Sequence, residues 1–148
     1  MKTVVIIYSK TGNTRAVALK LAHSMYAEVL EVKAVSDDPN ILIPELVVKP
    51  SVEPYEHLVF ASPVHGFSLS KIMEVYLKGL PDLTGKSVDL FVTHYFPFAW
   101  MGGNRALKQM KLIVESKNGV VGEATSINWS NRKRDSDVIS MIEKYTKL

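Results

Sequence analysis

The stretch that decides the fold is residues 3–14, TVVIIYSKTGNT. Its first part, residues 3–8, is a nearly continuous apolar run, which is typical of a β-strand buried on both faces. Residues 9–15, SKTGNTR, join this run to residues 14–26, where apolar side chains recur every three or four positions. A buried strand followed by an amphipathic helix predicts the opening of a β-α-β unit.

Working outward, the same alternation continues to the end of the chain. Further strands are predicted at residues 28–32, 57–62, 88–94 and 120–129, and further helices at residues 70–80, 105–117 and 135–147. Residues 34–56 contain four prolines, which break any long helix, so we predict a short or irregular connector there. Strands that alternate with helices predict an α/β fold, a three-layer α/β/α sandwich around a five-stranded parallel sheet.

Length and composition limit the class of protein. The chain has 148 residues, of which 47% are hydrophobic and 22% charged, and this predicts one soluble globular domain over residues 1–148. It has no cysteine, which excludes disulfides, thiolate metal sites and thiol nucleophiles. The four histidines lack the spacing of metal ligands, so no metal site is predicted.

Charge and hydropathy limit the partners. The formal net charge of +3 is too small to predict nucleic-acid binding. No window approaches 18 apolar residues, and no signal segment precedes the first strand, so we expect a cytoplasmic protein with no membrane contact.

Three loops are predicted to meet at the carboxyl edge of the sheet, where open parallel sheets bind ligands. The first, residues 9–15, offers hydroxyls, a glycine and backbone N–H groups at a helix N-terminus, which favours a phosphate without a metal. The second, residues 62–67 (SPVHGF), places His65 and Phe67 where they can flank a flat ligand. The third, residues 93–103, has four aromatic side chains in six residues, which predicts stacking on a planar ring. The alternative for each loop is ordinary capping or packing on the core.

Two common nucleotide-binding motifs are absent from the sequence. Gly85, Lys86 and Ser87 look like the end of a P-loop, but Leu80 stands where that motif requires glycine, and a strand follows where a helix should. The sequence also contains no G-x-G-x-x-G, so the nicotinamide fingerprint is missing.

These motifs resemble those of the flavodoxin family. Residues 5–14, VIIYSKTGNT, match the family's FMN-phosphate loop, S-x-T-G-N-T, and residues 55–66, YEHLVFASPVHG, resemble the strand and second flavin loop of flavodoxin-like reductases. Residues 83–92 resemble the entry to the fourth strand, and the pair Gly102 and Gly103 before a helix also fits. The resemblance covers nearly the whole chain and implies a flavodoxin-like sheet of order 2-1-3-4-5.

The resemblance implies an FMN site built from the three loops. The first loop would hold the phosphate through Ser9, Lys10, Thr11, Gly12, Asn13 and Thr14. The second would border the ring through Pro63, Val64, His65, Gly66 and Phe67. The third would add Thr93, His94, Tyr95, Phe96, Gly102 and Gly103. Tyr95 is the expected stacking side chain, and no side chain is assigned a catalytic role.

We therefore expect an FMN-binding, flavodoxin-like protein that acts in low-potential electron transfer, and we favour a non-enzymatic carrier. The chain departs from the family in three ways: the third loop lacks an acidic G-D pattern, the second loop lacks a tryptophan, and the chain is basic. Carrier flavodoxins are usually strongly acidic. A basic chain favours a redox partner protein with an acidic docking surface.

Two alternatives stay open. The first is a small FMN-dependent NAD(P)H:quinone-type oxidoreductase, in which His65 or His94 could assist proton delivery. The second is a flavin-free phosphate-binding module. A receiver domain is excluded, because it needs acidic residues where this chain has Tyr8 and Ser9 after the first strand and Ser62 and Pro63 after the third.

Overall fold

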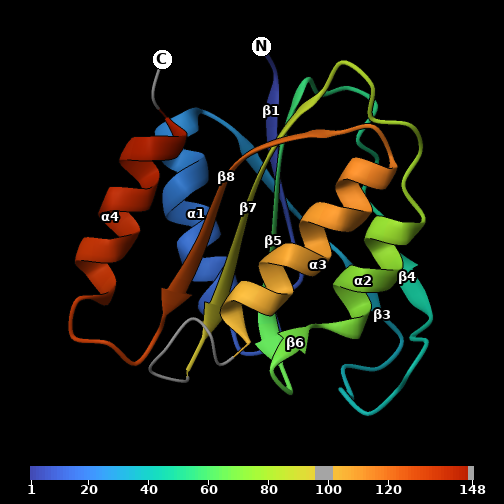
Figure 1. Ribbon diagram of the computed structural model, residues 1–148, viewed down its shortest axis with the longest axis horizontal. Coiled ribbons are helices and arrows are strands. Elements are labelled where there is room, and N and C mark those ends of the chain that lie inside the picture. Colours follow the sequence, from blue (N-terminus) through green and yellow to red (C-terminus); the bar gives the residue numbers. More distant parts are fainter. Residues whose placement is uncertain (96–101, 147–148) are drawn as a thin grey trace.

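A parallel sheet forms the middle layer of the molecule (Figure 1). The computed structural model describes residues 1–95 and 102–146. The parallel strands are β1 (Thr3–Ile7), β2 (Glu28–Glu31), β5 (His57–His65), β7 (Ser87–His94) and β8 (Val120–Asn128). They are arranged β2-β1-β5-β7-β8, which is the order 2-1-3-4-5 when these five strands are counted along the chain. The fold class and strand order predicted from the sequence are confirmed.

Strand β1 lies inside the sheet, between β2 and β5. Val5 pairs with Val29 of β2 on one side and with Val59 of β5 on the other. Val4 to Ile7 are fully buried, as the continuous apolar run predicts for a strand covered on both faces. The edge strand β2 begins and ends with glutamate and remains partly exposed, as is usual for strands that must resist edge-to-edge pairing.

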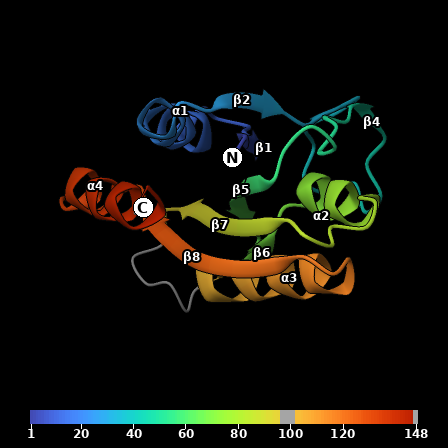
Figure 2. The same cartoon turned by 90° about the horizontal axis from the view of Figure 1, so that it is seen from above.

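Two pairs of helices cover the sheet (Figure 2). Helices α1 (Asn13–Met25) and α4 (Arg134–Tyr145) pack on one face, and α2 (Lys71–Lys78) and α3 (Gly103–Ser116) pack on the other. All four helices lie within three residues of their predicted bounds. None of the described helices is long and apolar enough to cross a membrane.

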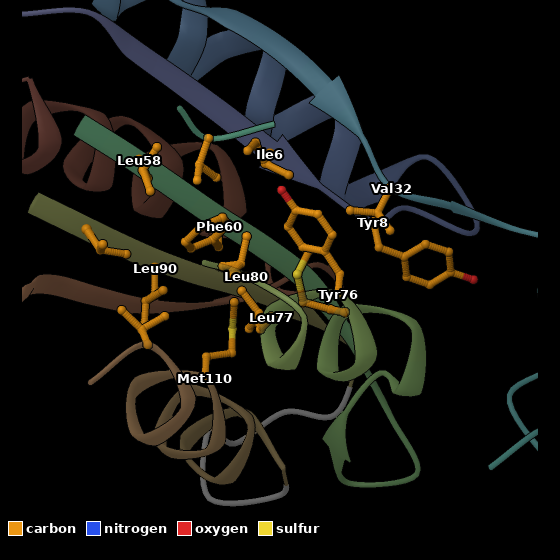
Figure 3. Close-up of a cluster of buried hydrophobic side chains, with 14 of the residues drawn as sticks. Ile6, Tyr8, Val32, Leu58, Phe60, Tyr76, Leu77, Leu80, Leu90 and Met110 are labelled. Carbon is orange, nitrogen blue, oxygen red and sulfur yellow. The ribbon is translucent and has the colours of Figure 1, made fainter. Parts of the chain in front are cut away.

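The core has two halves, one on each face of the sheet, because successive side chains of a strand point to opposite faces. Ile6, Phe60 and Leu90 face α2 and α3, where they meet Leu77 and Met110 (Figure 3). The side chains next to them in the strands face α1 and α4.

Residues 34–56 form the irregular connector that the prolines predict, with one addition. Strands β3 (Lys33–Ala34) and β4 (Leu46–Val48) pair with each other in antiparallel fashion and form a separate small sheet. The connector therefore adds no strand to the main sheet.

The second predicted loop is mostly strand, which corrects the prediction of a loop over residues 62–67. Strand β5 continues to His65, and β6 (Ser68–Leu69) turns back to pair with it. Gly66 and Phe67 form the turn, with φ angles of 54° and 63°. Two successive residues with positive φ are typical of the tight turns that match the twist of a β-hairpin. The sequence did not reveal the hairpin because phenylalanine is uncommon at such a position.

Candidate functional site

The three predicted loops meet at the carboxyl edge of the sheet. A cleft of about 190 Å³ lies between them. Its described lining is Lys10, Thr11, Asn13, Pro63, Val64, His65, Thr93, His94, Tyr95 and Trp129. The sequence had singled out every one of these residues except Trp129. The parallel register of the sheet explains this convergence, because it places the ends of β1, β5 and β7 side by side.

The first loop is shaped by the side chain of Ser9. Its Oγ accepts hydrogen bonds from the backbone N–H groups of Gly12, at 3.2 Å, and Arg15, at 3.3 Å. Gly12 takes a left-handed conformation with φ of 97°, which costs little without a Cβ. The chain thereby turns into α1 within a few residues of β1.

The N-terminus of α1 is open to an anion. No side chain caps the helix at Gly12, and the first turn contains no acidic residue. Within the described part of the chain, the backbone N–H groups of Thr11, Asn13 and Thr14 have no acceptor. Unpaired N–H groups and the positive end of a helix dipole together favour a phosphate.

Two cations lie in the first loop, and they differ in availability. Arg15 is bound to Glu31 of β2 through two hydrogen bonds, Nε to Oε2 at 3.0 Å and Nη2 to Oε1 at 2.5 Å. Lys10 is exposed and forms no ion pair with a described residue. Lys10 is therefore the cation that can meet a phosphate at this loop.

Thr14 lies behind the loop instead of lining the cleft. It is 1% exposed, and its Oγ1 is 2.8 Å from Oγ1 of Thr93 in β7. The two hydroxyls hold the start of α1 against β7. The backbone N–H of Thr14 therefore remains available to a ligand at the loop, whereas its hydroxyl is bonded to Thr93.

The first and third loops touch each other directly. Asn13 Nδ2 donates a hydrogen bond to the Tyr95 hydroxyl at 3.0 Å, and Ser130 Oγ donates to the Tyr95 carbonyl at 2.9 Å. The Tyr95 side chain is 60% exposed and lines the cleft, so its ring is available for the stacking role predicted for it. Phe96, which was also predicted to contribute, lies outside the described residues.

His65 lies in the cleft with its ring edge-on to Tyr8, at 6.0 Å between ring centroids. Burial lowers the pKa of His65, and the nearby charge of Lys10 lowers it further, while Asp37 raises it. The imidazole is therefore mainly neutral at pH 7. Behind it, the Tyr8 hydroxyl donates to Asp37 Oδ1 at 3.1 Å, and burial followed by the charge of Asp37 raises the pKa of Tyr8.

Gly102 and Gly103, which follow the third loop, allow close packing of neighbouring segments. A Cβ at Gly102 would lie 2.6 Å from the Cα of Phe67, so the hairpin turn rests directly on the start of α3. A Cβ at Gly103 would lie 2.3 Å from the Oγ of Ser126 in β8. Both glycines are buried. Although both were predicted as cofactor residues, what the structure shows is how they bring α3 up to the hairpin and the sheet.

Sequence reasoning missed three residues of this site. Trp129 follows β8, and its ring lies 4.4 Å from the guanidinium carbon of Arg134. Its position at the end of the fifth predicted strand was the signal that could have found it. Tyr8 ends the first predicted strand, and that position was likewise a signal. Asp37 lies in the connector, where the sequence has no periodicity from which its place could be predicted.

The arrangement of strands, helices and loops is that of flavodoxins and flavodoxin-like flavoproteins. No family model and no curated protein matches the sequence. Solved structures of this fold match over nearly the whole chain at low sequence identity. The flavodoxin-fold, WrbA-like protein from Agrobacterium tumefaciens is 13% identical, with a TM-score of 0.75 over 99% of this chain and 93% of that one.

Two further solved structures are similar. A flavoprotein from Lactobacillus acidophilus in complex with FMN is 18% identical, with a TM-score of 0.67 over 94% of this chain and 97% of that one. Flavodoxin 2 from Bacillus cereus is 12% identical, with a TM-score of 0.70 over 99% of each chain. At these identities the likeness shows the fold, and the chemistry has to be argued from the site.

Proposed function

We propose that this chain binds FMN in the carboxyl-edge cleft and acts in electron transfer. The observation that carries the proposal is the row of unpaired N–H groups at Thr11, Asn13 and Thr14, placed at the N-terminus of α1 beside Lys10. A phosphate monoester is the guest that such donors fit best. The likeness to a flavoprotein that holds FMN supports the choice of this particular phosphate.

The residues present fit the two ends of FMN differently. The phosphate would accept hydrogen bonds from the first loop, and Lys10 would balance its charge. The cleft of about 190 Å³ is smaller than the roughly 300 Å³ that enclosed organic ligands usually need. The ring would therefore be held between the β5 hairpin and Tyr95 with part of its edge exposed, which suits direct electron exchange with a partner.

Bound FMN would supply the redox chemistry, since it accepts and releases electrons singly or in pairs. The side chains of this chain would bind and orient it. His65 would border the ring as a neutral imidazole, and the Asn13–Tyr95 hydrogen bond would join the phosphate end to the ring end.

The partner that we propose is a redox protein with an acidic docking surface. Exposed cations occur in two of the segments that contribute to the cleft: Lys10 lines it, and Arg132 and Lys133 follow shortly after Trp129, which also lines it. Like-signed charges around an exposed cofactor edge steer partners of the opposite sign. Association should therefore weaken as salt is raised.

The test is flavin binding followed by absorbance and calorimetry. Protein incubated with FMN and desalted should keep the flavin absorbance, and riboflavin, which lacks the phosphate, should bind much more weakly. Lys10→Gln should lower FMN affinity roughly tenfold, or about 1.4 kcal/mol. Lys20→Gln, on the exposed surface of α1, is the matched control. A colourless protein, or equal binding of FMN and riboflavin, would contradict the proposal.

A reductase that oxidises NAD(P)H and reduces quinones is the second candidate. The observation that favours it is the position of His65 in the cleft, because reduction of a quinone requires protons as well as electrons and an imidazole can take up a proton from water and pass it on. Steady NAD(P)H oxidation with a quinone acceptor, slowed by His65→Asn at unchanged FMN content, would support this candidate. If no flavin is retained but phosphate binds, the flavin-free phosphate-binding module remains.

A further inference from the structure

A second and larger hollow lies at the opposite, amino edge of the sheet, at the end of the molecule where Figure 1 marks both chain termini. Its volume is about 600 Å³, within the range of roughly 300–1,000 Å³ that is typical of small-molecule sites. Thr3, His57, Ser87 and Asp89, at the starts of β1, β5 and β7, form its floor. The C-terminal ends of α1 and α4 form its walls.

The floor contains a chain of polar side chains that the carboxyl-edge site does not use. Thr3 Oγ1 lies 3.3 Å from His57 Nδ1, and His57 Nε2 lies 2.7 Å from Asp89 Oδ2. The backbone N–H of Glu123 donates to Asp89 Oδ1 at 2.7 Å. Register explains the grouping, because Thr3 pairs directly with His57 and all three side chains face the α1 and α4 layer. Asp89 is thus held in place with its carboxylate at the hollow.

The electrostatics of this edge favour a cation. The strands are parallel and both covering helices run against them, so α1 and α4 present their C-termini here. A helix C-terminus carries about half a negative charge. The carboxylate of Asp89 adds to it. Two cationic groups also line the hollow, the side chain of Lys144 and the α-amino group of Met1, but both residues are exposed and their ammonium groups can extend into water.

Tyr26 supplies a second, independent observation. It is 99% exposed and ends α1 in the left-handed conformation, with φ of 52° and ψ of 41°. Glycine is the usual residue at such a position, since a side chain there is strained. This chain instead places an aromatic ring there, in full contact with water, at the mouth of the hollow beside Met25. Aromatic faces attract cations, and thioethers pack well on rings.

We propose that the amino edge binds a small aromatic amine in its protonated form. The ammonium group lies toward Asp89 and the helix C-termini, and the aromatic body packs against Tyr26 and Met25. The site shares no residue with the FMN cleft, so this inference goes beyond the proposed electron-transfer function and does not depend on it.

The experiment compares three probes of similar shape on the full chain: 2-phenylethylamine, 2-phenylethanol and 3-phenylpropionate. Each is titrated at neutral pH and followed through the backbone amide NMR signals. The amine is expected to bind at least tenfold more tightly than the other two and to shift the amides of Thr3, Tyr26, His57 and Asp89. Equal binding of all three probes, or no shift at these residues, would overturn the proposal.

Amino-acid substitutions test whether the amine binds at this hollow. Tyr26→Gly and Asp89→Asn should each weaken amine binding at least fivefold, whereas Lys144→Gln should strengthen it. Tyr26→Gly is suited to this test because glycine accepts the backbone conformation without strain.

Two control variants should leave the affinity for the amine unchanged. Asn118→Gly relieves another positive φ angle, of 69°, outside the hollow, and Asp135→Asn removes an exposed carboxylate at the start of α4. Undiminished binding by both Tyr26→Gly and Asp89→Asn would refute the site.

Discussion

The two edges of the sheet show how one architecture produces two opposite chemistries. At the carboxyl edge, α1 begins with uncapped N–H groups, and Lys10 stands beside them. At the amino edge, α1 and α4 end around a partly buried His57–Asp89 pair. Because the helices run against the strands, every β-α-β unit turns positive helix ends toward one edge and negative ends toward the other. The difference between the two ligand classes that we propose follows from this polarity.

The edges also differ in where they use left-handed backbone. The carboxyl edge uses glycine at Gly12, Gly66 and Gly102, and Phe67 beside Gly66, where loops must turn sharply or approach each other closely. The amino edge uses Gly85 and Asn118 in the turns before β7 and β8, and also Tyr26, where nothing requires a side chain for packing. Substitutions at these positions can therefore test whether the first edge is built for close fit and the second for contact with a ligand.

The largest effect is expected from Gly102→Ala. The new Cβ would lie 2.6 Å from the Cα of Phe67 and 2.8 Å from Cγ1 of Val64, and the φ of 114° is itself strained for alanine. Because the nearest atom belongs to the backbone, the hairpin has to move as a unit. We expect a loss of about 3 kcal/mol in the free energy of unfolding, measured by urea denaturation.

Gly66→Ala is the matched control for this substitution. Gly66 also has a positive φ, but no atom lies within 4 Å of the position its Cβ would take. Only the backbone strain remains, so the loss should be about 1 kcal/mol. If both substitutions cost the same, close packing of the hairpin on α3 is not what Gly102 provides.

A smaller effect of opposite sign is expected at the amino edge. Tyr26→Gly should raise the free energy of unfolding by up to about 1 kcal/mol, because it removes strain at an αL helix end and no buried contact. Thermal and urea unfolding measure the gain. A net destabilisation would mean that the ring packs on the protein, and would weaken the case that it is kept for a ligand.

The smallest effect is a pH dependence at the carboxyl edge. Burial lowers the pKa of His65 in the folded protein below its ordinary value of 6.5, which applies in the unfolded chain. Between the folded-state and the unfolded-state pKa, the unfolded chain therefore binds more protons than the folded one. Stability should therefore rise with pH through this window and level off above it. His65→Phe, which keeps a ring against Tyr8, should flatten the profile between about pH 5 and about pH 7.5 in urea denaturation series. An unchanged profile would assign the dependence to other groups.

The sequence predicted the fold well because the decisive signals are local. The apolar run of β1 and its polar loop reveal a buried strand that enters a helix, and the apolar runs of β5 and β7 are likewise buried. The candidate site followed from the rule that parallel strands end at one edge. That rule needs only strand positions, so it placed Lys10, His65 and Tyr95 together without any knowledge of distances.

What the sequence could not predict depends on contacts between distant segments. Asp37 reaches Tyr8 from a connector without periodicity, and the packing of Gly102 on Phe67 joins residues far apart in the chain. The amino-edge hollow was missed for another reason. Its residues are single polar positions at strand starts, such as Thr3 and Asp89, and they form no motif until the register aligns them.

The position of β1 inside the sheet, between β2 and β5, has a consequence for how the protein is made. Thr3 pairs with His57, a residue that follows 54 positions later in the chain. At roughly 5–20 residues per second, a ribosome needs about 3–11 s to synthesise that interval. Throughout it, TVVII is an apolar strand with at least one unpaired edge, which is the kind of segment that nascent-chain chaperones shield. Among the parallel strands, β1 is thus the one that waits longest for a partner during translation.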